Sequence, residues 1–191
     1  MVYPFSALVG QEELKTGLLL NAVNPMIGGL LIRGQKGTGK SSAVRALADI
    51  LPPIETVKDC PFNCAPEDPT NMCSDCYSRY KLGEELEAET RPMEIISLPI
   101  GATEDRVIGS LDIERAIGEG ISSLQPGLMA EANQGILYID EVNLLPDHIT
   151  DSILDAAASG WNTVERGGIS VSHPSRVILV GTMNPEEGEL R

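Results

Sequence analysis

Aromatic and basic residues are scarce in this sequence. Its 191 residues include two Phe, one Trp and four Tyr, and 14 Lys and Arg stand against 28 Asp and Glu, for a net charge of -14. Because aromatic rings are few, aliphatic side chains must fill the core. Binding to nucleic acid without sequence preference depends on basic side chains that neutralise phosphates. The composition therefore argues against a DNA or RNA partner.

Long apolar runs are also missing. None approaches the roughly 20 residues of a membrane-spanning helix, so we expect no membrane association. The opening stretch MVYPFSALVGQEEL has neither the basic-then-apolar pattern of a secretory signal nor the Arg- and Ser-rich character of an organelle leader. The expected compartment is the cytoplasm, where cysteines are more often metal ligands or free thiols than disulfides.

Short apolar runs alternate with segments of helical spacing. This alternation predicts an α/β fold with a parallel core sheet. In the first helix, Leu14, Leu18 and Leu19 are predicted to share the buried face, and Asp147 is predicted to cap the fourth. The predicted strands are 30–32, 93–99, 136–139 and 176–182, the predicted helices are 10–23, 40–51, 127–135 and 147–159, and a hairpin is predicted over 161–175 with Gly167 and Gly168 at its turn.

Residues 55–91 differ from the rest of the chain. They are rich in proline, cysteine and acids, with little apolar periodicity, and a short acidic helix is predicted at 82–89. We interpret them as an insertion into one nucleotide-binding domain that spans residues 1–191.

The stretch GLLIRGQKGTGKSS carries the clearest chemical signal. Gly34, Gly39, Lys40 and Ser41 satisfy the pattern G-x-x-x-x-G-K-[ST], between a predicted strand and a predicted helix, which is the context that this phosphate-binding motif requires. Backbone N–H groups of such a loop surround phosphate oxygens, Lys40 reaches the β- and γ-phosphates, and the Ser41 hydroxyl ligates Mg²⁺. The predicted nucleotide-binding residues are Gly34, Gln35, Lys36, Gly37, Thr38, Gly39, Lys40, Ser41 and Ser42.

Two acids and an amide follow predicted strands. In ILYIDE, Asp140 and Glu141 leave the end of a buried strand, where the first acid would hold Mg²⁺ and the second would polarise an attacking water. In VILVGTMNP, the Asn184 amide would bond the γ-phosphate or orient that water, although a turn residue before Pro185 explains it equally well on local grounds. The predicted catalytic residues are therefore Lys40, Glu141 and Asn184.

Four cysteines form the pattern C-x₃-C-x₈-C-x₂-C. Cys60, Cys64, Cys73 and Cys76 have a spacing that lets four thiolates meet around one tetrahedral Zn²⁺. An iron–sulfur cluster and four unligated thiols are the alternatives. The two histidines, His148 and His173, have no metal-ligand spacing and are predicted to be solvated or to cap helices.

These motifs, in this order, resemble the AAA+ ATPases with Walker A, Walker B and sensor-1 elements. The stretches FSALVGQEELKTGLLLNAV, GATEDRVIGSLDIERAI and PGLMAEANQGILYIDEVNLLPDHITDSILDAAASG resemble the ATPase subunit of magnesium chelatase more narrowly, and the cobaltochelatase small subunit is similar. The resemblance implies a P-loop, three-layer α/β/α fold that uses ATP and Mg²⁺ in a homo-oligomeric ring. It also implies two partners, a subunit with an integrin-like metal-binding domain and a porphyrin-binding subunit, which together insert Mg²⁺ or Co²⁺ into a tetrapyrrole.

The resemblance further implies a strand order of 1-4-3-2, a helix-2 insertion at 103–127 and a pre-sensor-1 insertion at 161–175. The family has a fifth strand, an arginine finger and a C-terminal helical domain that these 191 residues do not show, and its plant-type members have no such cysteine cluster. We therefore expect ATP binding with weak hydrolysis by this chain alone, unless Arg106, Arg115 or Arg166 takes the place of the arginine finger, because Arg191 is a terminal residue.

Other functions fit the same motifs. A MoxR-like metal-centre chaperone shares both insertions, and a nucleotide-dependent binding module would keep the site without turnover. A DNA-acting AAA+ protein is disfavoured by the negative charge.

Overall fold

The computed structural model describes residues 3–111 and 124–186, and a four-stranded parallel sheet forms its core. The strand order is β1–β10–β7–β4, which confirms the predicted order and all four predicted strands. The strands are β1 (Leu30–Arg33), β4 (Ile95–Leu98), β7 (Ile136–Ile139) and β10 (Ile178–Met183).

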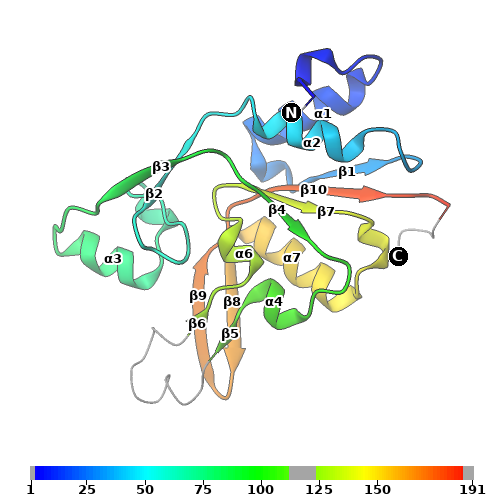
Figure 1. Cartoon of the computed structure of the whole chain (residues 1–191). Coiled ribbons are helices and arrows are strands. Elements are labelled where there is room, and N and C mark those ends of the chain that lie inside the picture. Colours follow the sequence, from blue (N-terminus) through cyan, green and yellow to red (C-terminus); the bar gives the residue numbers. More distant parts are fainter. Residues whose placement is uncertain (1–2, 112–123, 187–191) are drawn as a thin grey trace.

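Helices cover both faces of this sheet (Figure 1). Along β7, Ile136 and Tyr138 pack with one helical layer, and the alternate residues Leu137 and Ile139 pack with the other. The fold is thus the expected three-layer α/β/α sandwich. The first layer holds α1 (Glu12–Val23) and α2 (Lys40–Ala48), and the second holds α4 (Glu104–Ile108), α6 (Leu128–Glu131) and α7 (Asp147–Ser159).

Three smaller antiparallel pairs stand outside the core sheet. β2 (Ile54–Val57) pairs with β3 (Ala88–Arg91) and frames α3 (Ser74–Lys81). The predicted hairpin is confirmed as β8 (Trp161–Arg166) and β9 (Ile169–Pro174), and both turn glycines have positive φ. β5 (Ser110–Leu111) pairs with β6 (Leu124–Gln125) within the predicted helix-2 insertion. Residues 112–123 of that insertion, which include Arg115, lie outside the described ranges. Short 3₁₀ turns are η1 (Phe5–Ala7), η2 (Pro25–Ile27), η3 (Pro69–Asn71) and η5 (Val142–Leu144).

The predicted acidic helix at 82–89 is wrong. The helix of this segment is α3, which ends before Gly83, a residue in the left-handed conformation at φ 76°. Ala88 and Glu89 belong instead to β3, where they pair with Val57 and Thr56. Backbone pairing with a neighbouring strand therefore overrides the helix preference of the acids.

Details of the predicted helices also need correction. Leu19 is 41% exposed, because it lies about 100° around α1 from Leu18, and Asn21 is buried in its place. The Asn21 amide donates to the carbonyl of Leu179 at 2.9 Å, which satisfies its donor within the core. Asp147 is the first residue of α7 and not its cap, a position held by Pro146.

Two helices are shorter than predicted, and one strand is less buried. α2 ends at Ala48, and α6 covers only Leu128–Glu131. The edge strand β1 buries Ile32 alone, with Leu31 42% exposed, because only one strand flanks it. Within the described ranges, no helix is long and apolar enough to cross a membrane.

Candidate nucleotide-binding site

The glycine-rich loop between β1 and α2 has a backbone conformation that can point its N–H groups toward one ligand. Gly37 and Gly39 have φ angles of 83° and 81°, a left-handed conformation that side chains disfavour. The Lys40 ammonium lies across the loop and donates to the carbonyl oxygens of Gly34 at 2.5 Å and Gln35 at 2.8 Å. The Gln11 amide holds the opposite side of the loop through the carbonyl of Thr38 at 2.7 Å. These hydrogen bonds therefore help to fix the conformation of the loop.

The structure brings the predicted acids and amide to this loop. The carboxyl ends of parallel strands, where ligands bind in open α/β sheets, place Asp140, Glu141 and Asn184 beside the start of α2. All of them line one cleft of about 470 Å³. Gly34 and Gln35 do not line the cleft, but their carbonyls hold Lys40. The lining residues are Lys36, Gly37, Thr38, Gly39, Lys40, Ser41, Ser42, Asp140, Glu141, Thr182 and Asn184.

Two residues that sequence reasoning missed connect the two motifs. The Tyr138 hydroxyl lies 2.8 Å from Ser41 Oγ and donates to Asp140 Oδ1 at 3.1 Å, and Thr182 Oγ1 donates to the same carboxylate oxygen at 2.5 Å. Burial raises the pKa of Tyr138, so its hydroxyl keeps the proton that it donates. Ser41 and Asp140, the two predicted Mg²⁺ ligands, therefore share one hydrogen-bonded chain.

Glu141 has an unusual backbone conformation. Its φ of 56° is left-handed, which costs energy for a residue with a side chain. Its backbone N–H donates to Thr182 Oγ1 at 3.1 Å, which helps to hold this conformation. Strain of this kind concentrates at functional sites, so the conformation supports a functional role for Glu141.

The position of Asn184 agrees both with a turn residue before Pro185 and with an amide of the nucleotide site. Its Oδ1 accepts from the backbone N–H of Glu186 at 3.2 Å, as a turn residue before proline would. It is also buried, with 6% of its surface exposed, and lines the cleft. The amide group is therefore fixed in position at the edge of the site.

The described arginines proposed as substitutes for an arginine finger are paired elsewhere. Arg106 contacts the Glu131 carboxylate at 3.3 Å, and Arg166 forms an ion pair with Asp105. Neither lines the cleft, whose cationic side chains are Lys36 and Lys40. Arg115 and Arg191 lie outside the described residues.

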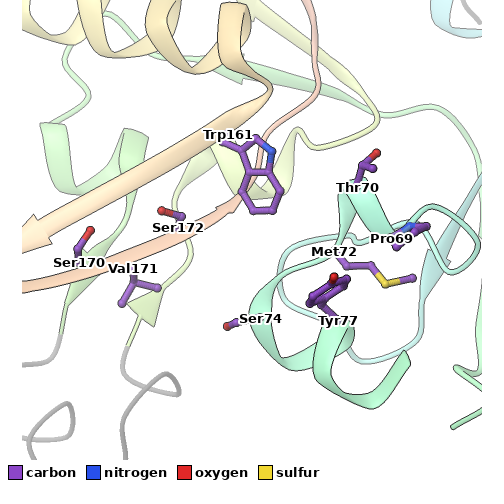
Figure 2. Close-up of a pocket in the computed structure, with 9 residues that line it drawn as sticks. All are labelled: Pro69, Thr70, Met72, Ser74, Tyr77, Trp161, Ser170, Val171 and Ser172. Atoms are coloured by element: carbon purple, nitrogen blue, oxygen red, sulfur yellow. The ribbon is translucent and has the colours of Figure 1, made fainter. Parts of the chain in front are cut away.

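A second, larger hollow of about 570 Å³ lies elsewhere, between η3–α3 and the β8–β9 hairpin. Figure 2 shows Trp161 at the base of the hairpin, with Met72 and Tyr77 on the opposite wall. None of its lining residues is charged, whereas Lys36 and Lys40 line the smaller cleft, which is therefore the better candidate for a nucleotide site. Its lining residues are Pro69, Thr70, Met72, Ser74, Tyr77, Trp161, Ser170, Val171 and Ser172.

The four cysteines converge, and one histidine prediction is wrong. The sulfur atoms of Cys60, Cys64, Cys73 and Cys76 all lie within 4.8 Å of one another. His148 is exposed, as predicted, whereas His173 is fully buried, because it stacks on Phe62 with ring centroids 5.0 Å apart.

Comparison with known proteins agrees with these motifs. The family described as magnesium chelatase, subunit ChlI, matches residues 111–189. The magnesium-chelatase subunit ChlI homolog of Methanocaldococcus jannaschii is 65% identical over 190 residues, which cover 100% of this chain and 51% of the relative. The chain is thus similar, over its whole length, to about half of a magnesium chelatase ChlI subunit. The ChlI subunit of Nostoc sp. is 56% identical, over 100% of this chain and 51% of its own length.

The fold of this chain is also that of a solved relative. The relative comes from a cryo-EM-based model of the complex between the BchI and BchD subunits of magnesium chelatase. The match has a TM-score of 0.84 at 52% identity and covers 100% of this chain and 57% of that one. The four-stranded parallel sheet is thus the AAA+ core, and the chain spans about half the length of the curated relatives it matches.

Proposed function

We propose that this chain is the nucleotide-binding core of an ATP-driven metal-chelatase subunit, with a cysteine-containing insertion at 55–91. In this proposal, ATP binding and hydrolysis in a ring of such subunits drive the insertion of Mg²⁺, or Co²⁺ in a cobalt enzyme, into a tetrapyrrole. The observation that supports it most directly is the single cleft shared by the Lys36–Ser42 loop, Asp140, Glu141 and Asn184.

The geometry of the loop supports phosphate binding. Lys40 Nζ bonds two loop carbonyls, and phosphate oxygens, which carry full charge, would compete with those carbonyls for its protons. The N-terminus of α2, which carries the partial positive charge of the helix dipole, would also attract the phosphates. Lys40 would therefore neutralise the β- and γ-phosphates where the backbone N–H groups converge.

The residues beside the loop suit Mg²⁺. Ser41 and Asp140 offer hard oxygen donors, which Mg²⁺ prefers, and the Tyr138 hydroxyl joins them at 2.8 and 3.1 Å. Bound there, Mg²⁺ would neutralise charge on the phosphates. Ser41 would hold it directly, and Asp140 would hold its hydration shell.

Glu141 and Asn184 line the same cleft as the loop, which supports a role for both on an attacking water. Glu141 would accept a proton from that water, and the fixed Asn184 amide would orient the water or bond the γ-phosphate. Thr182 holds Asp140 and the Glu141 backbone together, so it is a positioning residue.

Partners are proposed by analogy with the relatives. The solved relative is in a complex between BchI and BchD. We propose a similar companion subunit with an integrin-like metal-binding domain for this chain, together with a porphyrin-binding subunit, in the cytoplasm.

Replacing Lys40 tests the nucleotide site. We expect Lys40→Ala to weaken Mg-ATP binding about 10- to 100-fold, because a hydrogen bond to a charged group contributes about 1.5–3 kcal/mol. Lys58→Ala is the matched control, because Lys58 is a distant exposed lysine paired with Glu87. A fluorescent nucleotide titration measures both variants, and unchanged affinity in Lys40→Ala would contradict the site.

Metal insertion tests the wider function. The chain would be combined with the two partner subunits, a porphyrin, Mg²⁺ and ATP, and metalloporphyrin absorbance would be followed. ATP-dependent insertion that is lost with Glu141→Gln supports the proposal. Nucleotide binding without any insertion, in a mixture that also contains a longer ChlI relative able to lend an arginine, would instead favour the binding-module alternative.

A further inference from the structure

The four cysteines form one compact group at the inner face of the 55–91 insertion. Cys64, Cys73 and Cys76 have 0%, 4% and 2% of their surface exposed, and Cys60 is half-buried. The sulfurs of Cys60 and Cys76 are 3.6 Å apart, well beyond the roughly 2.05 Å of a disulfide bond. These four are the only cysteines in the sequence. All thiols of the chain therefore lie in this one cluster.

The backbone is bent in order to bring them together. Asp59 and Asn63 have left-handed φ angles of 60° and 47°, and each directly precedes a cysteine of the first pair. The second pair opens α3, with Cys73 at the N-cap and Cys76 in the first turn. The Cys73 backbone N–H donates to Cys64 Sγ at 3.0 Å, a bond that stabilises a thiolate. The chain therefore holds two strained positions and an amide donor around four sulfurs.

The loop between Cys60 and Cys64 is clamped to the AAA+ core. Asn133, which is 1% exposed, donates from its amide to the carbonyls of Phe62 and Asn63, both at 2.9 Å. Its Oδ1 accepts from the backbone N–H of Arg176 at 2.9 Å. Asn133 thus links the cysteine loop to the segments that lead into β7 and β10. Such surrounding bonds are typical of a metal site, where they orient the ligands.

We propose that Cys60, Cys64, Cys73 and Cys76 bind one structural Zn²⁺ as four thiolates. A tetrahedral ion with Zn–S bonds of about 2.3 Å requires sulfurs about 3.8 Å apart. Sulfurs that already lie within 4.8 Å of one another need to close in by only about 1 Å. An iron–sulfur cluster holds its four cysteines on two or four irons, so sulfurs on different irons lie farther apart than the 4.8 Å seen here, and a single ion fits better. With four protein ligands the site is closed, as structural zinc sites are.

The ion would fix one wall of the larger hollow. Met72 precedes Cys73 and Tyr77 follows Cys76, and both residues face Trp161 across that hollow (Figure 2). The cysteines also pack in the same core cluster as Val164 of the hairpin. Loss of the ion should therefore change the surroundings of Trp161, the only tryptophan in the sequence, without reaching the nucleotide cleft.

Elemental analysis of the chain, purified without chelator, tests the proposal. We expect one zinc per chain, thiols that resist titration in the folded protein, and four titratable thiols after a strong chelator removes the metal. Metal removal should shift the Trp161 fluorescence and lower the melting temperature, and added Zn²⁺ should reverse both changes. Replacing zinc with Co²⁺ should give the absorption of a tetrahedral tetrathiolate. Mg-ATP affinity should stay within twofold, which keeps this test separate from that of the nucleotide site.

Variants complete the experiment. Cys73→Ser should lose the metal, whereas Asp75→Asn, an exposed neighbour between two ligands, should keep one zinc per chain. If Cys73→Ser fails to fold, the chelator and Co²⁺ measurements on the unchanged chain still decide. Iron in place of zinc, disulfides, or a folded metal-free protein with four freely titratable thiols would each overturn the proposal.

Discussion

Thr182 shows how one hydroxyl joins two motifs. It is 1% exposed at the end of β10, donates to Asp140 and accepts from the backbone N–H of Glu141. The N–H that it satisfies belongs to a residue in a strained conformation. A single side chain therefore sets the position of both predicted Walker B acids.

Removing that hydroxyl should destabilise the fold. Thr182→Val keeps the shape but leaves the Glu141 N–H and the Asp140 carboxylate without this partner, so we expect the free energy of unfolding to fall by about 1–3 kcal/mol. Thr182→Ser, which keeps the hydroxyl, should lose about 1 kcal/mol for the missing methyl. Urea denaturation compares the three proteins. A valine variant as stable as the unchanged chain would show that the hydroxyl contributes nothing.

The sequence predicted the site residues that belong to a spaced pattern and missed those that do not. Lys40 and Asp140 stand in motifs whose chemistry requires them. Tyr138 and Thr182 lie inside apolar strands, where an aromatic or β-branched residue is an ordinary strand former. Their role depends on strands that are distant in sequence and adjacent in space. The parallel register of β7 and β10 places the Thr182 hydroxyl beside the Asp140 carboxylate, and Tyr138 reaches the same oxygen from two residues earlier in the chain.

The buried His173 links the two strands of the β8–β9 hairpin and stacks on Phe62 of the 55–91 insertion. His173 Nδ1 donates to the carbonyl of Pro174, and Nε2 therefore accepts from the Asn162 amide, both at 2.9 Å. A second proton on Nε2 would face that donor. Burial lowers the pKa of His173, in agreement with this arrangement.

Stability should therefore depend on pH through this hairpin. An unfolded histidine titrates near pH 6.5, whereas the folded His173 takes up its proton only at lower pH. As the pH falls below about 6.5, the unfolded state gains a proton first, so the free energy of unfolding decreases. The free energy of unfolding falls by about 1.4 kcal/mol for each pH unit that separates the pKa of His173 in the unfolded chain from that in the folded chain.

His173→Gln isolates this contribution. Its free energy of unfolding should decline less between pH 7 and pH 5 than that of the unchanged chain, as measured by urea denaturation at each pH. Acid would also release a thiolate-bound metal, but it would do so in both proteins, so the difference between their slopes belongs to His173. Equal slopes would contradict the assignment.

Elements with a strong period or a fixed turn were predictable, and those decided by pairing were not. Four core strands and the Gly167–Gly168 hairpin follow from local pattern. The 82–89 segment has a helical composition, yet Ala88–Arg91 forms β3, because β2 offers an antiparallel partner. Composition alone carries no information about that partner.

The phosphate site of the molecule is nearly complete, but few positive charges line its cleft. In the described ranges, Lys36 and Lys40 supply the cationic side chains of the cleft, and Arg106 and Arg166 are paired with acids outside it. Enzymes of this superfamily complete such a site with an arginine from a neighbouring subunit. In GTPases, an arginine finger is worth about 10³–10⁵ in rate.

We therefore expect residues 1–191 to bind Mg-ATP and to hydrolyse it slowly on their own. Steady-state phosphate release measures this. Adding a longer ChlI relative whose own catalytic glutamate is replaced by glutamine should raise turnover, because that partner can lend an arginine but cannot hydrolyse ATP itself. Fast turnover by the chain alone would contradict the prediction. Its loss in Arg106→Ala or Arg166→Ala would then identify the arginine that leaves its acidic partner, Glu131 or Asp105, to complete the site.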